Sequence, residues 1–143
     1  MKCIRLHAWR GSHYIGAAEL LTTLGRITAE LSWELQIDEV APGPAGARIE
    51  ALVRQSRVCT SELILAAFLD GQIIDGELRG YVDDADEPYI VLRAVDSTDW
   101  DIECVDPAVY FAVKTALVNS VDTSSFVGQD RYKAGPTEIA PYA

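Results

Sequence analysis

The residue types that carry most enzyme chemistry are few in this chain and do not fall into a catalytic spacing. The two histidines, His7 and His13, stand near one another in the sequence, and no serine is set in the G-x-S-x-G turn that exposes a nucleophile. The three cysteines, Cys3, Cys59 and Cys104, form no C-x-x-C pair, and no H-E-x-x-H motif is present. We therefore predict no catalytic residue, no metal site and no cofactor.

Carboxylates are the remaining side-chain groups that could take part in catalysis or metal binding. Asp99 and Asp101 have the alternate spacing of two acids on one face of a strand, and glycoside hydrolysis uses such a pair, but exposed acids in this arrangement are more typical of a solvated surface. An EF-hand loop beginning at Asp83 would need Gly at its sixth position and Glu at its twelfth. The chain has Pro88 and Ala94 there. We interpret both groups of acids as surface.

The charge of the chain is concentrated in one stretch. Residues 70–106 contain twelve acids against only Arg79 and Arg93, which accounts for the whole formal net charge of −10. A localised negative field repels nucleic acids and anionic membrane surfaces and attracts a basic protein. We expect a basic protein partner, and neither nucleic acid nor membrane binding.

Length and composition indicate one folded domain. The chain has 143 residues, of which 49% are hydrophobic and 24% charged, as in an ordinary globular protein. The first residues alternate apolar and polar types, unlike a secretory signal, and the densest apolar run, residues 63–69, is far too short to span a bilayer. Three widely spaced cysteines favour buried thiols, so we expect a cytoplasmic protein.

The first half of the chain predicts the order β-α-β-α. Residues 2–9 alternate as a strand, and Ser12 is a candidate N-cap for a helix over 13–31, in which leucine and isoleucine recur at helical spacing. Residues 33–38 alternate again, and Pro44 stands where a helix over 44–55 would begin. These elements precede the acidic part of the chain.

The second half predicts an antiparallel meander over about residues 60–105. Its strands are expected at 63–69, 72–82, 89–95 and 99–104, with Asp70 and Gly71 forming the first hairpin turn. Asp106 and Pro107 have the N-cap and N1 types of a closing helix to about 119. The prediction is therefore an α+β domain over 1–119, with the helices on one face of the sheet, followed by an extended C-terminal tail over 120–143.

The acids of this meander are expected to form one surface. In the last strand, Asp99, Asp101 and Glu103 alternate with apolar residues, so we predict that these three carboxylates face solvent in a row. Tyrosines in register with the acids would serve as aromatic anchors. The predicted partner-binding residues are Asp75, Glu77, Tyr81, Asp83, Asp84, Asp86, Tyr89, Asp99, Asp101 and Glu103.

One stretch of the chain carries a resemblance to a known class. Residues 96–103, Asp-Ser-Thr-Asp-Trp-Asp-Ile-Glu, lead through Asp106 and Pro107 into the closing helix. Together with the size and the α+β plan, this resembles the small acidic immunity proteins that bacteria keep against polymorphic toxins and contact-dependent inhibition. The resemblance implies tight one-to-one binding that blocks a toxin domain, often a basic nuclease.

Two other functions stay open from the sequence. The first is a small enzyme or ligand-binding domain with a pocket between the helices and the sheet, to which Arg5, His7 or Trp9 would contribute. The second is a homo-oligomeric structural protein, such as a homodimer, that pairs its subunits through the tail over 120–143.

Overall fold

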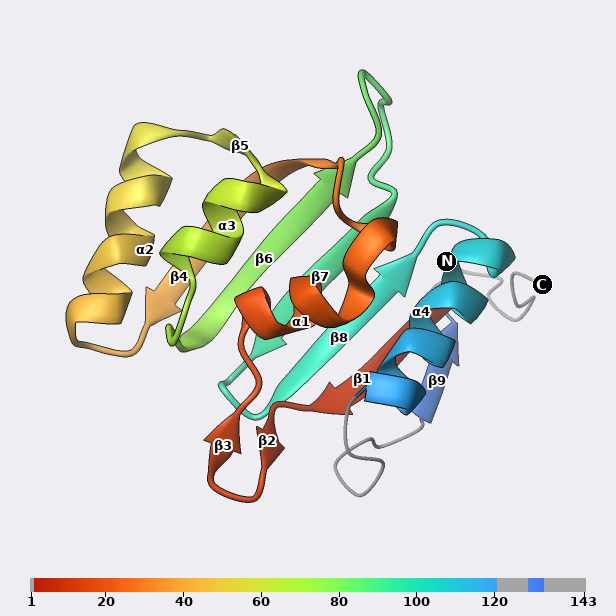
Figure 1. Ribbon diagram of the computed structural model, residues 1–143, viewed down its shortest axis with the longest axis horizontal. Coiled ribbons are helices and arrows are strands. Elements are labelled where there is room, and N and C mark those ends of the chain that lie inside the picture. Colours follow the sequence, from red (N-terminus) through yellow and green to blue (C-terminus); the bar gives the residue numbers. More distant parts are fainter. Residues whose placement is uncertain (1, 121–128, 133–143) are drawn as a thin grey trace.

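The computed structural model describes residues 2–120 and 129–132 and is built on a seven-stranded antiparallel sheet. The strand order is β5-β4-β6-β7-β8-β1-β9 (Figure 1). The bounds are Lys2–His7 for β1, Ser32–Val40 for β4, Val58–Thr60 for β5, Ile73–Tyr81 for β6, Ile90–Val95 for β7, Asp99–Cys104 for β8 and Gln129–Tyr132 for β9.

The helices lie over one face of this sheet, as Figure 1 shows, with α2 beside α3 and β4. They are α1 (Ala17–Leu24) with the short 3-10 helix η1 (Gly25–Ile27), α2 (Pro44–Gln55), α3 (Ser61–Ala67) and α4 (Pro107–Ser120). A small hairpin of β2 (Trp9–Arg10) and β3 (His13–Tyr14) precedes α1. In residues 2–120, no helix covers the opposite face, which we call the open face.

The core between sheet and helices contains two buried tryptophans, Trp33 and Trp100, whose indole N–H groups are hydrogen-bonded. The indole N–H of Trp100 donates to the carbonyl of Ile15 at 2.7 Å, and that of Trp33 donates to Ser61 Oγ at 2.7 Å. Ser61 in turn donates to the carbonyl of Thr28 at 2.6 Å. Because an unpaired buried donor is costly, these bonds fix how the α1 and α3 segments sit on the sheet.

The predicted α+β class is confirmed, as are the central strands and the closing helix. β6, β7 and β8 form the expected antiparallel meander, and the helix after Pro44 ends at Gln55 as predicted. Asp106 caps α4, since its Oδ1 accepts from the Val109 backbone N–H at 2.9 Å.

The strand predicted over 63–69 is wrong, because this segment is the helix α3. Thr60 is its N-cap and accepts from the Leu63 N–H at 3.2 Å. A short apolar run fits either a buried strand or a helix, and here the inward positions are Ile64 and Phe68, four residues apart. The Asp70 and Gly71 pair therefore joins α3 to β6 and is not a hairpin turn.

The helix predicted over 13–31 is also shorter than expected. Residues 13 and 14 pair with 9 and 10 in the small hairpin, turned at Gly11 with a φ of 64°. The helix begins at Ala17 without a side-chain cap, so Ser12 is not its N-cap, and it ends where Gly25 takes a φ of 54°. The helical spacing of apolar residues continues in the sequence beyond Gly25, which is why the sequence predicts a longer helix. In the structure, the chain forms the 3-10 helix η1 there.

Part of the predicted tail belongs to the sheet. Residues 129–132 pair with β1, with Lys2 opposite Tyr132 and Arg5 opposite Gln129. The rest of the predicted tail, residues 121–128 and 133–143, lies outside the described residues, and the predicted pairing of subunits through it stays a prediction. Within the described ranges, no helix has the length and apolar character needed to cross a membrane.

Candidate functional site

Charged side chains on the open face form ion pairs across neighbouring strands. In the register of the sheet, Glu77 of β6, Arg93 of β7, Asp101 of β8 and Arg5 of β1 stand opposite one another in turn. Arg93 Nε lies 2.9 Å from Glu77 Oε1 and its Nη1 lies 3.0 Å from Glu103 Oε2. Arg5 makes a two-pronged contact with Asp101, at 2.8 and 3.1 Å. We call these five residues the ion-pair row.

The pairs are partly withdrawn from solvent, which strengthens them. Burial alone lowers the pKa of Arg93, but the carboxylates of Glu103 and Glu77 outweigh it and the pKa is raised. The hydrogen bond to Asp101 raises the pKa of Arg5, and that to Glu77 raises the pKa of Arg79. All three guanidinium groups are therefore held in the charged form.

The prediction that three carboxylates of β8 face solvent is wrong for Asp101 and Glu103, because these two side chains are buried. Asp99, Asp101 and Glu103 share the open face, opposite the buried Trp100, but Asp101 and Glu103 are each only 5% exposed. Asp99 lies 3.2 Å from Nδ1 of His7. The sequence could not reveal this, because the arginines that cover the carboxylates come from strands whose register is set by the fold.

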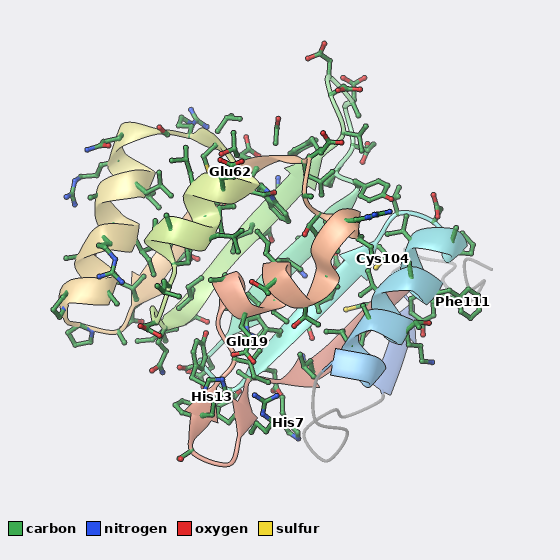
Figure 2. The ribbon with its side chains drawn as sticks, in the orientation of Figure 1. His7, His13, Glu19, Glu62, Cys104 and Phe111 are labelled. Atoms are coloured by element: carbon green, nitrogen blue, oxygen red, sulfur yellow. The ribbon has the colours of Figure 1, made fainter. Side chains whose placement is uncertain are left out.

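The exposed acids lie instead in the loop between β6 and β7. Residues 83–88, the acidic loop, project beyond the end of the sheet (Figures 1 and 2). Asp83, Asp84, Asp86 and Glu87 are all exposed there, and none of these four forms an ion pair with any described residue. No lysine or arginine occurs between residues 80 and 92. Within the described residues, no basic side chain therefore compensates the charge of these four acids.

The base of the acidic loop is fixed by the strands. The Tyr89 N–H donates to the Gly80 carbonyl at 2.7 Å, and Ala85 N–H donates to the Val82 carbonyl at 3.0 Å. Val82 is 42% exposed and Tyr89 is half-buried against the core. The loop thus combines free carboxylates with apolar surface at its base.

The remaining predicted partner-binding residues lie elsewhere. Tyr81 is half-buried and its hydroxyl donates to Glu34 at 3.5 Å, while Asp75 accepts from the Asp96 N–H at 3.0 Å at the other end of β6. The ten predicted residues therefore do not form one acidic surface. They divide between the acidic loop with its base (Asp83, Asp84, Asp86, Tyr89) and the open face, where Asp75 and Tyr81 lie at opposite ends of β6 (Asp75, Glu77, Tyr81, Asp99, Asp101, Glu103).

A groove on the helical side was missed by the sequence reasoning. It has a volume of about 610 Å³ and lies between α1, α3 and the segment that follows α3. His13 Nε2 lies 2.6 Å from Glu19 Oε1 at its rim, and Arg10 binds the other oxygen of Glu19 at 3.3 Å. Figure 2 shows His13, on the hairpin, beside Glu19 of α1.

This groove differs from the pocket expected between the helices and the sheet. Arg5 and His7 do not line it, and their side chains are engaged on the open face. Trp9 contributes only indirectly, because its ring meets that of Tyr14 edge-on with centroids 5.3 Å apart, and Tyr14 lines the groove. The helical misassignment of residues 13–16 concealed the hairpin that forms one wall.

The described cysteines and acids offer no metal centre. Among the residues whose side chains the structure describes, no three His, Cys, Asp or Glu side chains are placed to share an ion. Cys3, Cys59 and Cys104 are buried free thiols, and burial raises the pKa of Cys59 to about 11 and of Cys104 to about 12. Such thiols are poor nucleophiles at neutral pH.

Comparison of the chain with protein-family models, curated proteins and solved structures found no match.

Proposed function

We propose that this protein binds a basic protein partner through the acidic loop and inhibits it, in the manner of the bacterial immunity proteins that its sequence resembles. The observation that carries the proposal is the set of four exposed carboxylates at Asp83, Asp84, Asp86 and Glu87, which no described basic side chain compensates. Buried reduced cysteines support a cytoplasmic setting, where such an inhibitor would meet a toxin that has entered the cell.

The contrast with the open face supports the choice of the loop. There the carboxylates are already bound to arginines, so a partner would have to break the ion-pair row to use Asp101 or Glu103. In the acidic loop, no such exchange is needed, and each carboxylate is free to meet a lysine or arginine. The loop is therefore the surface on which a basic partner gains most.

Unpaired like charges at the tip of a loop repel one another, which is a cost to the free protein. A basic partner removes this repulsion on binding and is steered toward the loop before contact. Val82 and Tyr89 at the base then offer apolar area to bury, since charge alone contributes more to the rate of association than to affinity.

The experiment is a kinetic comparison of two triple charge reversals with the same change in net charge. The test variant carries Asp83→Lys, Asp84→Lys and Asp86→Lys. The matched control carries Glu30→Lys, Glu50→Lys and Glu62→Lys, which are exposed acids on other parts of the molecule. The partner is captured from native extract at low salt, identified by mass spectrometry, purified and tested for inhibition and association rate.

The loop variant should associate more slowly by about tenfold to a hundredfold at low salt, with loss of inhibition, whereas the control should change by less than about threefold. The association rate of the unmodified protein should fall steeply as salt is raised. If association slowed equally in both variants, the change in rate would be due to net charge and not to the acidic loop, which would contradict the proposal. A salt-independent rate would refute electrostatic recognition.

A further inference from the structure

The groove between α1 and α3 carries a second inference, which goes beyond the proposed function and uses none of the acidic loop. Its walls include the apolar side chains of Tyr14, Leu65, Phe68 and Leu69. The volume of about 610 Å³ lies within the range of small-molecule sites, which are mostly apolar with a few placed polar groups. Here Asp70 is the polar group whose charge is not accounted for.

Asp70 occupies a left-handed backbone position, which aspartate tolerates. It follows the end of α3 with a φ of 60°, where glycine or asparagine would fit without a charge. The C-terminal end of a helix carries a partial negative charge that repels a carboxylate, and Arg48 offsets part of it by donating to the Leu69 carbonyl at 2.7 Å. In the described part of the chain, Asp70 makes neither an ion pair nor a hydrogen bond that would offset this repulsion.

Leu69, next to Asp70, adds a second free-energy cost, because its apolar side chain is 56% exposed to water. An exposed leucine next to an unpaired carboxylate gives the groove one apolar and one anionic element in contact with solvent. Both costs are removed together by a ligand that has an apolar body and a positive head.

The other charges around the groove are already engaged. Glu19 is bound by Arg10 at 3.3 Å and by His13 at 2.6 Å. Arg48 donates to the Leu69 carbonyl at 2.7 Å and forms no ion pair with Asp70 within the described structure. With Arg10 and Glu19 neutralising one another, the carboxylate of Asp70 sets the sign of the lining charge.

The groove also depends on a missing side chain. A Cβ at Gly16 would lie 3.1 Å from the Gly71 carbonyl oxygen, closer than such atoms usually approach, and 3.4 Å from the Tyr14 ring. Because glycine has no Cβ, residues 14–16 can approach residues 68–72 closely, and this approach sets the shape of the groove.

We propose that this groove binds a small organic amine, with its ammonium group against the Asp70 carboxylate and its apolar body against Leu65, Phe68 and Tyr14. The ammonium pairs with Asp70, which forms no ion pair with any described residue, and the apolar body covers Leu65 and Leu69. Neutral and anionic molecules of the same shape lack the first of these contacts and bind more weakly.

The test uses 2-phenylethylamine as the probe and 2-phenylethanol as its neutral analogue, each titrated into the full chain and followed by two-dimensional NMR. For a ligand of this size, the dissociation constant of the amine should be on the order of 1 mM. Binding of the alcohol should be at least about tenfold weaker. Shifted backbone signals should come from residues 13–22 and 65–72.

Three variants separate the groove from general attraction to an acidic protein. Asp70→Asn should weaken the amine about tenfold and keep the turn, because asparagine also accepts a positive φ. Leu65→Gln should weaken the amine and the alcohol alike. Asp84→Asn, an equal charge change in the acidic loop, should leave both unchanged.

Equal binding of amine and alcohol, or an unchanged affinity in Asp70→Asn, would overturn the proposal. Signals that shift mainly in residues 83–87 would also overturn it, because the amine would then be attracted by the acidic loop. None of these outcomes bears on inhibition of a protein partner, so the two proposals fail independently.

Discussion

The ion pair between Arg93 and Glu77 gives the most direct test of the interpretation that the charged side chains of the open face bind one another and stabilise the fold. Replacing Arg93 with methionine keeps a long apolar stem but removes the contacts at 2.9 Å to Glu77 and 3.0 Å to Glu103. A hydrogen bond to a charged group contributes about 1.5–3 kcal/mol, and partial exposure of Arg93 reduces this. We expect Arg93→Met to cost about 3 kcal/mol of unfolding free energy.

A double-mutant cycle isolates the single contact. The variants Arg93→Met, Glu77→Met and their combination are unfolded in urea, and the coupling energy of the pair should be about 1.5 kcal/mol. The control cycle uses Arg10 and Glu19, whose side chains are 31% and 32% exposed, against 30% and 15% for Arg93 and Glu77. For this pair, whose carboxylate is more exposed than that of Glu77, we expect less than about 0.5 kcal/mol, with further loss in high salt.

A coupling energy for Arg93 and Glu77 no larger than that of the control would refute the reasoning. The arginines of the open face would then contribute little, and the carboxylates of β8 would again be available to a partner. In that case the choice of the acidic loop over the open face would lose its basis.

Two further predictions concern the core. Ser61→Ala should cost about 2–4 kcal/mol in urea unfolding, because it leaves the Trp33 indole N–H and the Thr28 carbonyl without the Ser61 hydroxyl; a loss below about 1 kcal/mol would mean that water replaces it. Burial raises the pKa of the Cys104 thiol from 9.0 to about 12, so its contribution to stability is complete below pH 9 and is lost as the pH rises from 9 toward 12. Cys104→Ala should flatten this alkaline decline in thermal unfolding, and an unchanged decline would contradict the assignment.

Much of the fold was accessible from the sequence because local signals were strong. Pro44 at the start of α2 and the Asp106–Pro107 pair at the start of α4 predicted these helices from single residues with known backbone preferences. Alternation predicted the strands of the meander. Where an apolar run was short, as in α3, periodicity could not separate helix from strand, and the boundary residue Thr60 was the better signal.

The candidate site was less accessible, because burial of a charge depends on its neighbours across the sheet. Alternation placed Asp101 on the correct face, but only the pairing of β8 with β1 brings Arg5 over it. The groove has no local signature for the same reason. Asp70 and His13 line it from segments far apart in the sequence, and no local pattern indicates that these two segments line one groove.

The position of β1 in the sheet has a consequence for how the chain folds. β1 precedes every other described strand, yet its neighbours are β8 and β9, with Lys2 opposite both Cys104 and Tyr132. Contacts between such distant residues require a large loss of chain entropy before they form, so β1 should join the sheet late. Until then, its edge and that of β8 expose unpaired backbone groups, and a chain stalled at this stage would be prone to aggregate through them.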